Sequence, residues 1–218
     1  MRTVVVYESM YGNTHTVAEG IALGLRDLGE VVVVPVHRAT PELLDKVDLV
    51  VVGGPTHVHG LSSEATRNNA VAEAVNHSLT LDEDAPGPGL RDWLADLSLP
   101  GHVGAAAFDT RLDGPAIVTG RASRGIVHRL HKVGVTVISD PESFLVTKQS
   151  TLVDGEVEHA RRWGTELAAY MNARHDRVHG HQTEEARLRT VDAARDHLSG
   201  DLTQHANFVA HRTASSWR

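Results

Sequence analysis

The sequence predicts an α/β protein built around a doubly wound sheet of five parallel strands. Short apolar, β-branched runs recur along the chain and alternate with segments of helical periodicity. Such runs are typical of strands that are buried on both faces, as in a parallel sheet covered by helices on each side. Regular alternation of strand and helix indicates the same architecture. A polar turn between the first strand and the first helix adds the pattern of an anion site.

The expected elements follow from apolar spacing and from start and stop signals. Strands are placed at 4–7, 31–34, 47–52, 101–108 and 135–138, the last broken at 139–143 and resumed at 144–146. Helices are placed at about 14–28, 41–44, 63–77, 90–97, 126–130 and 156–172. Gly29 is a typical residue after a helix end, and Thr40 with Pro41 is typical of a helix start.

Composition limits the possible functions. The chain has 218 residues, a formal net charge of −7, and no cysteine, which excludes disulfides and thiol chemistry. An acidic balance argues against nucleic acid as a partner. No apolar run reaches the length of a membrane span, and no signal-peptide pattern precedes the first strand, so we expect a cytoplasmic protein without a membrane partner. We expect one domain over 1–173 and a polar, His- and Arg-rich extension over 174–218, partly helical or disordered.

The first polar turn is rich in hydroxyl groups. Ser9, Asn13, Thr14 and Thr16 can donate hydrogen bonds to phosphate oxygens, and the turn holds neither Lys nor Arg. The ending of a Walker loop is absent, and only Gly12 stands where a dinucleotide fingerprint needs three glycines. The pattern therefore predicts a monophosphate site at a helix start. The alternative is an ordinary turn in which Asn13 or Thr14 serves only as the helix N-cap.

The stretch Ser9-Met10-Tyr11-Gly12-Asn13-Thr14 resembles the phosphate loop of the flavodoxin family. Tyr11 departs from the Thr that is common in classical flavodoxins and is similar to the Ser-Met-Tyr-Gly form of flavodoxin-like NAD(P)H:quinone reductases. The resemblance covers about residues 1–173. It implies strand order 2-1-3-4-5 and noncovalent FMN as the cofactor, with its phosphate on this loop.

A turn rich in glycine and proline follows the third strand, with the sequence Gly53-Gly54-Pro55-Thr56-His57-Val58-His59-Gly60. Such a turn lets backbone approach a flat ligand closely. The resemblance implies that this loop lies against the flavin, with His57 or His59 stacked on the ring or hydrogen-bonded to it. The alternative is a turn with two solvated histidines. Two histidines without a third ligand are weak evidence for a metal, and no metal site is assigned.

Phe108-Asp109-Thr110-Arg111 follows the fourth strand and, by resemblance, is the third loop that contacts the flavin. Phe108 either packs beside the flavin or completes the core. Asp109 either disfavours an anionic reduced flavin or caps the next turn. Arg111 offers a positive charge to a substrate or to the reduced flavin. The cofactor-binding residues expected from the three loops are Ser9, Met10, Tyr11, Gly12, Asn13, Thr14, Pro55, Thr56, His57, Val58, His59, Gly60, Phe108, Asp109, Thr110 and Arg111.

A long excursion over residues 61–98 interrupts the strand–helix alternation. It forms either a lid over the flavin or an additional part of the helix layer. Trp93 has helical spacing with Leu90, Leu94 and Leu97, which favours a core position over a stacking role. No catalytic residue is assigned.

Two functions remain open at this point, and whether the chain is an enzyme is one of the open questions. The first is an FMN-binding electron-transfer protein that docks redox partner proteins through an acidic surface. The second is an FMN-dependent oxidoreductase that passes electrons from NAD(P)H to a quinone or another small acceptor. Net charge and the lack of a recognisable nicotinamide site favour the first. Tyr11, His57 and the 61–98 excursion favour the second.

Overall fold

The computed structural model describes residues 1–57, 60–77, 79–85 and 88–177. The expected site residues Val58 and His59 lie outside this range, as does the extension beyond residue 177. The chain divides into two units, Met1–Asn172 and Ala173–Arg218, and the fold below is that of the first.

One sheet of seven strands forms the centre of the described domain. Its strands are β1 (Arg2–Tyr7), β2 (Glu30–Pro35), β3 (Leu49–His57), β4 (Gly60–Leu61), β5 (Gly104–Leu112), β6 (Thr136–Val137) and β7 (Glu142–Val146). The order is β2-β1-β3-β5-β6, and β7 also pairs with β5. All these pairs are parallel. The short β4 pairs antiparallel with the end of β3. The expected doubly wound α/β fold, with its strand order, is therefore confirmed.

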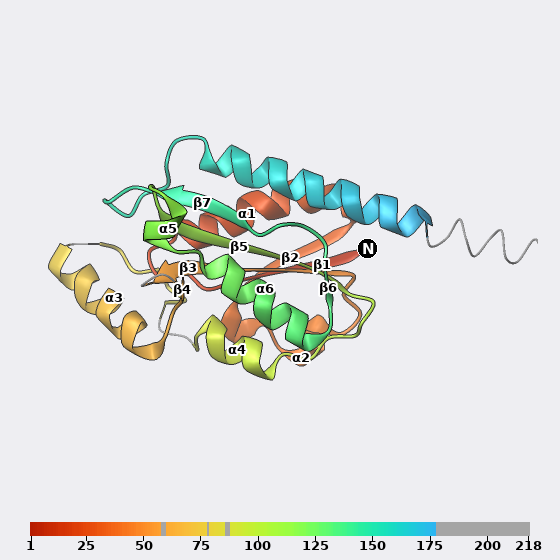
Figure 1. Cartoon of the computed structure of the whole chain (residues 1–218), viewed down its shortest axis with the longest axis horizontal. Helices are drawn as coiled ribbons and strands as arrows, with labels where there is room; N and C mark the ends of the chain where they lie inside the picture. The colour runs from red at the N-terminus through yellow and green to blue at the C-terminus, as the bar shows by residue number, and fades with distance from the viewer. Residues whose placement is uncertain (58–59, 78, 86–87, 178–218) are drawn as a thin grey trace, which may run out of the picture. The chain divides into compact units, whose positions relative to one another are not determined.

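Helices cover both faces of this sheet (Figure 1). They are α1 (Asn13–Leu25), η1 (Arg26–Leu28), η2 (Val36–Arg38), α2 (Pro41–Leu44), α3 (Glu64–His77), α4 (Leu90–Asp96), α5 (Ala116–Thr119), α6 (Ala122–Val133) and a final helix, which occupies 156–172 of this unit. The final helix and α1 lie on one face, and α2, α4 and α6 lie on the other.

Alternation along the strands produces two cores. Val4 and Val6 of β1 point to the face covered by α4 and α6, whereas Val5 and Tyr7 point to the face covered by α1. Successive side chains of a strand point to opposite faces, so a fully apolar strand must be covered on both. Trp93 is partly buried against the first core, as expected, and its indole N–H donates to the carbonyl of Ala39 at 2.9 Å.

The final helix approaches α1 closely because both helices present glycine at the contact. A Cβ added at Gly24 would lie 2.1 Å from the carbonyl oxygen of Arg161. A Cβ added at Gly164 would lie 2.3 Å from the carbonyl oxygen of Ile21. Neither position accepts a side chain without movement of backbone, so glycine sets the spacing of these helices.

Two strands run further than expected, and both extensions place expected loop residues in strands. β5 runs to Leu112 because β7 pairs with its second half, from Phe108↔Glu142 to Leu112↔Val146. Segment 108–111, expected after the strand, is therefore strand. β3 likewise runs to His57, where β4 pairs with it. The fifth strand is present as two pieces, β6 and β7, as expected from the polar break between them, and both pieces pair with β5.

Candidate functional site

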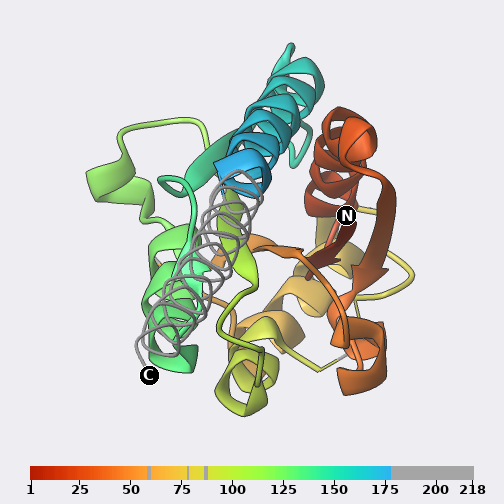
Figure 2. The same cartoon turned by 90° about the vertical axis from the view of Figure 1, so that its right-hand side faces the viewer.

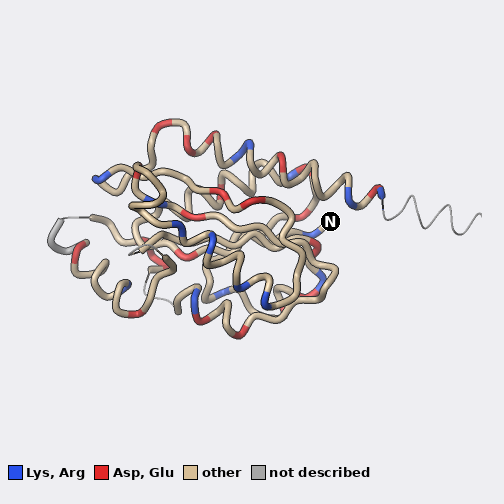
Figure 3. Tube along the Cα trace, in the orientation of Figure 1, with Lys and Arg blue, Asp and Glu red and all other residues tan. Residues whose placement is uncertain are grey.

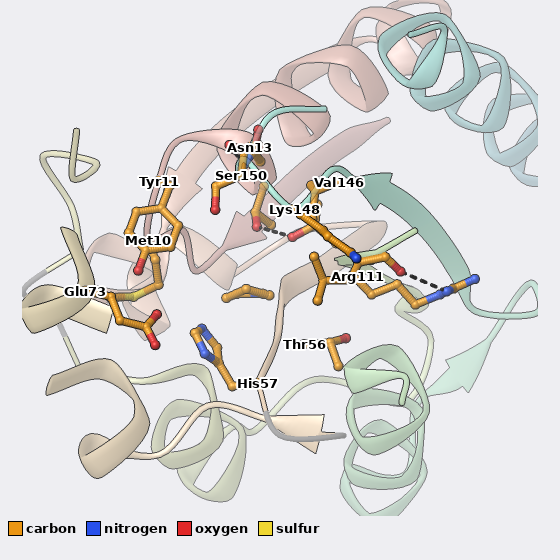
Figure 4. Close-up of a pocket in the computed structure, with 14 residues that line it drawn as sticks. Met10, Tyr11, Asn13, Thr56, His57, Glu73, Arg111, Val146, Lys148 and Ser150 are labelled. Atoms are coloured by element: carbon orange, nitrogen blue, oxygen red, sulfur yellow. Dashed lines mark hydrogen bonds between the residues drawn. The ribbon is translucent and has the colours of Figure 1, made fainter. Parts of the chain in front are cut away.

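A cavity of about 300 Å³ opens where β1, β3, β5 and β7 end (Figure 4). Because these strands are parallel, their carboxyl ends meet at one edge of the sheet, where ligands of doubly wound domains bind. Four segments and one helix line it, with the residues Met10, Tyr11, Asn13, Thr14, Pro55, Thr56, His57, Glu73, Thr110, Arg111, Leu112, Val146, Lys148 and Ser150.

The turn between β1 and α1 presents an uncapped helix start. Gly12 is the N-cap residue, with a left-handed φ of 83°, and no side chain accepts a hydrogen bond from the first amides of α1. A positive φ is the conformation that glycine adopts most readily. The alternative that Asn13 or Thr14 caps α1 is therefore wrong. The first amide groups of a helix carry partial positive charge and bind anions when left free.

The polar side chains of this turn reach across to other elements. The hydroxyl of Thr14 shares a buried hydrogen bond of 2.8 Å with the hydroxyl of Thr110 on β5. The amide of Asn13 donates to the carbonyl of Ser150 at 2.8 Å. The hydroxyl of Ser9 accepts from the amide of Gly12 at 3.1 Å. A hydroxyl group can donate one hydrogen bond and accept two, so Ser9 and Thr14 keep capacity for a ligand.

His57 presents a polar atom without a partner to the cavity. Its Nε2 atom is buried and has no hydrogen-bond partner among the described residues. Burial lowers the pKa of the imidazole below its ordinary 6.5, the carboxylates of Glu8 and Glu73 oppose this shift, and Arg67 adds to it. Figure 4 shows Glu73 and His57 at the same end of the cavity. A neutral imidazole there can donate one hydrogen bond to a ligand or accept one from it.

Tyr11 connects the turn to the helix of the long excursion. Its hydroxyl donates to the carbonyl of Ala70 in α3 at 2.9 Å. Burial raises the pKa of this phenol, and Glu73 raises it further, so the hydroxyl keeps its proton. Met10 packs beside Ala70 in a small separate apolar cluster. Helix α3 therefore forms one wall of the cavity.

Phe108 and Asp109 lie away from the cavity. Phe108 is fully buried, with its ring edge-on to Phe144 and Trp163 at 6.1 and 6.3 Å between centroids. The carboxylate of Asp109 accepts a hydrogen bond of 2.7 Å from the amide of Ser123 in the first turn of α6. Phe108 thus completes the core, and Asp109 caps the start of α6 instead of the turn that directly follows it.

The other expected residues divide into those that line the cavity and those that do not. The structure brings nine of them to the cavity: Met10, Tyr11, Asn13, Thr14, Pro55, Thr56, His57, Thr110 and Arg111. Ser9 and Gly12 shape the turn without lining the cavity, and Gly60 pairs with His57 in the β3–β4 hairpin. Arg111 lines the cavity while its Nη1 donates to the carbonyl of Gly114 at 2.7 Å.

Five lining residues were missed by the sequence analysis: Glu73, Leu112, Val146, Lys148 and Ser150. Three of these, Val146, Lys148 and Ser150, lie at or just after the end of β7. Their signal was the resumed strand at 144–146, whose carboxyl end must meet those of its parallel neighbours.

Neither a metal centre nor a membrane span is found in the described part of the chain. No group of three or more His, Cys, Asp or Glu among these residues is placed to hold a metal ion. None of the helices within the described ranges combines the length and apolar character needed to cross a membrane.

The strand order and the place of the cavity define this unit as a flavodoxin-like domain. The flavodoxin family model matches residues 5–90, which contain the first turn and the whole of β3. The resemblance to the flavodoxin family is thereby confirmed. No curated protein sequence matches the chain.

Solved structures show the same fold. A flavodoxin from the domain Archaea is 21% identical with a TM-score of 0.53 and covers 79% of this chain and 99% of its own. Oxidised Flavodoxin 1 from Bacillus cereus is 20% identical with a TM-score of 0.52, covering 79% and 98%. A flavodiiron core from Synechocystis sp. is 17% identical with a TM-score of 0.53, covering 79% of this chain but 36% of its own.

Proposed function

We propose that this protein binds FMN in the cavity and transfers electrons to and from a redox partner. The observation that carries the proposal is the uncapped start of α1 beside the hydroxyl of Thr14 and the amide of Asn13. These groups match a phosphate monoester, which needs several hydrogen-bond donors and a favourable dipole. The flavodoxin family match covers the same turn.

The rest of the cavity suits a flat, partly polar group. Pro55, Thr56 and His57 at the end of β3 and Thr110 at the end of β5 face the same space. The unpartnered Nε2 of His57 is available to a ring nitrogen or carbonyl. A volume of about 300 Å³ is within the range of cofactor sites, roughly 300 to 1,000 Å³. The residues present therefore fit the group that the fold implies.

In this proposal the chain binds FMN, orients it and shields it from solvent. The first turn of α1 would hold the phosphate, and His57 would hold one edge of the ring. FMN, when bound, supplies the redox chemistry itself. Arg111 and Lys148 add positive charge to the cavity, which favours a more reducible cofactor than Glu73 alone would allow.

Electron transfer is proposed ahead of an NAD(P)H:quinone oxidoreductase. In the two flavodoxins of solved structure, the match to this domain covers nearly the whole chain, so the shared fold is that of a whole flavodoxin. Measured NAD(P)H oxidation by the FMN-loaded protein with a quinone separates the two functions. Turnover without any second protein would favour the oxidoreductase.

The test is a fluorescence titration of flavin-free protein with FMN, with riboflavin as the control that lacks phosphate. We expect strong quenching with FMN and weak quenching with riboflavin. Thr14→Val should weaken FMN binding about 10- to 100-fold, because a hydrogen bond to a charged group contributes about 1.5–3 kcal/mol. Riboflavin binding should change little. The matched variant Thr16→Val alters an exposed hydroxyl on the same turn of helix and should retain FMN affinity.

Absence of binding by both flavins would refute the proposal. Equal loss of FMN and riboflavin affinity in Thr14→Val would refute the phosphate assignment alone, because the change would then act on the whole cavity.

A further inference from the structure

Three apolar side chains that lie close together in the chain are exposed to solvent. Leu112 is 50% exposed, Ile117 is 92% exposed and Val118 is 63% exposed. Leu112 is the last residue of β5 and lines the cavity, and Ile117 and Val118 lie on α5, in the segment that joins β5 to α6. Exposed apolar residues that gather in one place mark interaction sites more often than scattered ones.

Arg111 fixes this segment in place. One nitrogen of its guanidinium donates to the carbonyl of Gly114 at 2.7 Å, to the hydroxyl of Thr119 at 3.1 Å and to the carbonyl of Leu112 at 3.3 Å. Figure 2 shows α5, which carries Ile117 and Val118, standing out from the rest of the domain. The apolar side chains are therefore presented on a preorganised turn, which lowers the entropy lost on binding.

The chain segment that contains this turn and α6 is rich in basic residues, and Asp140, which precedes β7, lies beside Arg121 and Arg124. Residues 111–133 contain five Lys or Arg and one Asp, a formal charge of +4, whereas the whole chain carries −7. Helix α6 has no carboxylate, and its exposed side chains include Arg124, His128, His131 and Lys132 at helical spacing. Figure 3 shows the basic positions along α6.

This surface is continuous with the cavity. Leu112 and Arg111 line the cavity directly. The amide of Ala122, the first residue of α6, donates to the hydroxyl of Thr56 at 3.0 Å, and Thr56 is itself a lining residue. A partner bound here would sit beside whatever the cavity holds.

We infer that the α5–α6 face, formed by Leu112, Ile117, Val118, Arg124 and Lys132, docks an acidic redox protein. This inference rests on the proposed electron-transfer function and gives that function its partner class. Complementary charge steers association, and a central apolar patch supplies affinity that salt does not screen. The apolar component favours a protein over a nucleic acid, whose contacts would need only the basic residues. The sign of the face is opposite to that of the whole chain.

The test is direct binding of two probes to the full chain by calorimetry at low and high ionic strength. The acidic probe is a plant-type [2Fe–2S] ferredoxin, and the basic probe is cytochrome c. We expect ferredoxin to bind, and we expect its affinity to fall as the salt concentration rises. Arg124→Glu should reduce ferredoxin affinity about tenfold, and Ile117→Ser should reduce it severalfold without changing its salt dependence.

Matched variants separate local from global effects. Arg26→Glu makes the same charge change on an exposed residue at the far end of α1, and it should leave ferredoxin affinity within twofold. Leu23→Ser removes an apolar side chain that is 41% exposed on α1 and should also have little effect.

Three results would overturn the inference. The first is no measurable ferredoxin binding at low salt. The second is equal loss of affinity in Arg26→Glu and Arg124→Glu. The third is binding of a single-stranded oligonucleotide as tight as that of ferredoxin and unaffected by Ile117→Ser. The calorimetric measurement of ferredoxin binding does not require FMN. Failure of FMN binding would therefore refute the proposed function without deciding whether ferredoxin docks.

Discussion

The side-chain amide of Asn13 donates a hydrogen bond of 2.8 Å to the backbone carbonyl of Ser150. The two residues are 137 positions apart in the chain, and the bond joins the turn before α1 to the turn after β7. Both residues line the cavity, as does Lys148, two positions before Ser150. A cation therefore lines the same cavity as the turn before α1, which contains neither Lys nor Arg.

Replacing Lys148 with Gln should weaken FMN binding about 3- to 10-fold and leave riboflavin binding nearly unchanged. The reason is that a partly exposed lysine attracts a dianionic phosphate but gains little from an uncharged flavin. The difference should shrink as ionic strength rises. Fluorescence titrations at two salt concentrations measure it, with Lys46→Gln, an exposed lysine just before β3, as the control. A loss that is the same for both flavins would contradict this role.

Two Gly→Ala substitutions in helices should have opposite signs. Gly164→Ala places a Cβ 2.3 Å from the carbonyl oxygen of Ile21 and should lower the free energy of unfolding by about 1–3 kcal/mol or more. In Gly125→Ala, in α6, the new Cβ lies an ordinary 3.5 Å from Cδ1 of Leu61. This variant should raise the free energy of unfolding by about 0.5–1 kcal/mol, because alanine favours the helix. Urea unfolding of both variants checks the pair. Equal effects would show that the two helices can separate freely.

Removing the buried carboxylate of Asp109 should destabilise the domain by about 1–3 kcal/mol. Asp109→Ala leaves the amide of Ser123 buried without an acceptor, and that amide begins α6. The neighbouring Asp113→Ala changes an exposed carboxylate and should stay within about 0.5 kcal/mol. Thermal unfolding compares them. If Asp109→Ala instead altered flavin affinity with no change in stability, its assignment as a helix cap would be wrong.

The stability of the flavin-free protein should fall as pH falls below about 6.5. Burial lowers the pKa of His57 in the folded state, so the unfolded chain binds more protons in that window and stability rises with pH across it. This contribution is fully present above pH 6.5 and is lost as pH falls through the folded pKa. His57→Gln should reduce the slope of unfolding free energy against pH. An unchanged slope would mean that the imidazole titrates equally in both states.

The residue pattern alone was enough to predict the sheet and to locate the polar turn between β1 and α1. Val4 to Val6 form a strand that is apolar on both faces, and burial of such a strand requires helices on each side of a parallel sheet. Because turn chemistry is local, the segment from Ser9 to Thr14 could be identified from its residues and their order.

Only the tertiary structure decided which residues face the cavity. Phe108 and Thr110 share a strand, and pairing of β7 with β5 set the register that buries Phe108 and brings Thr110 to Thr14. Glu73 and Lys148 reached the cavity through packing of α3 and the β7 turn, contacts between segments far apart in the chain. Local residue patterns predict strands and turns. Long-range pairing decides their register, and a shift of one residue exchanges the two faces of a strand.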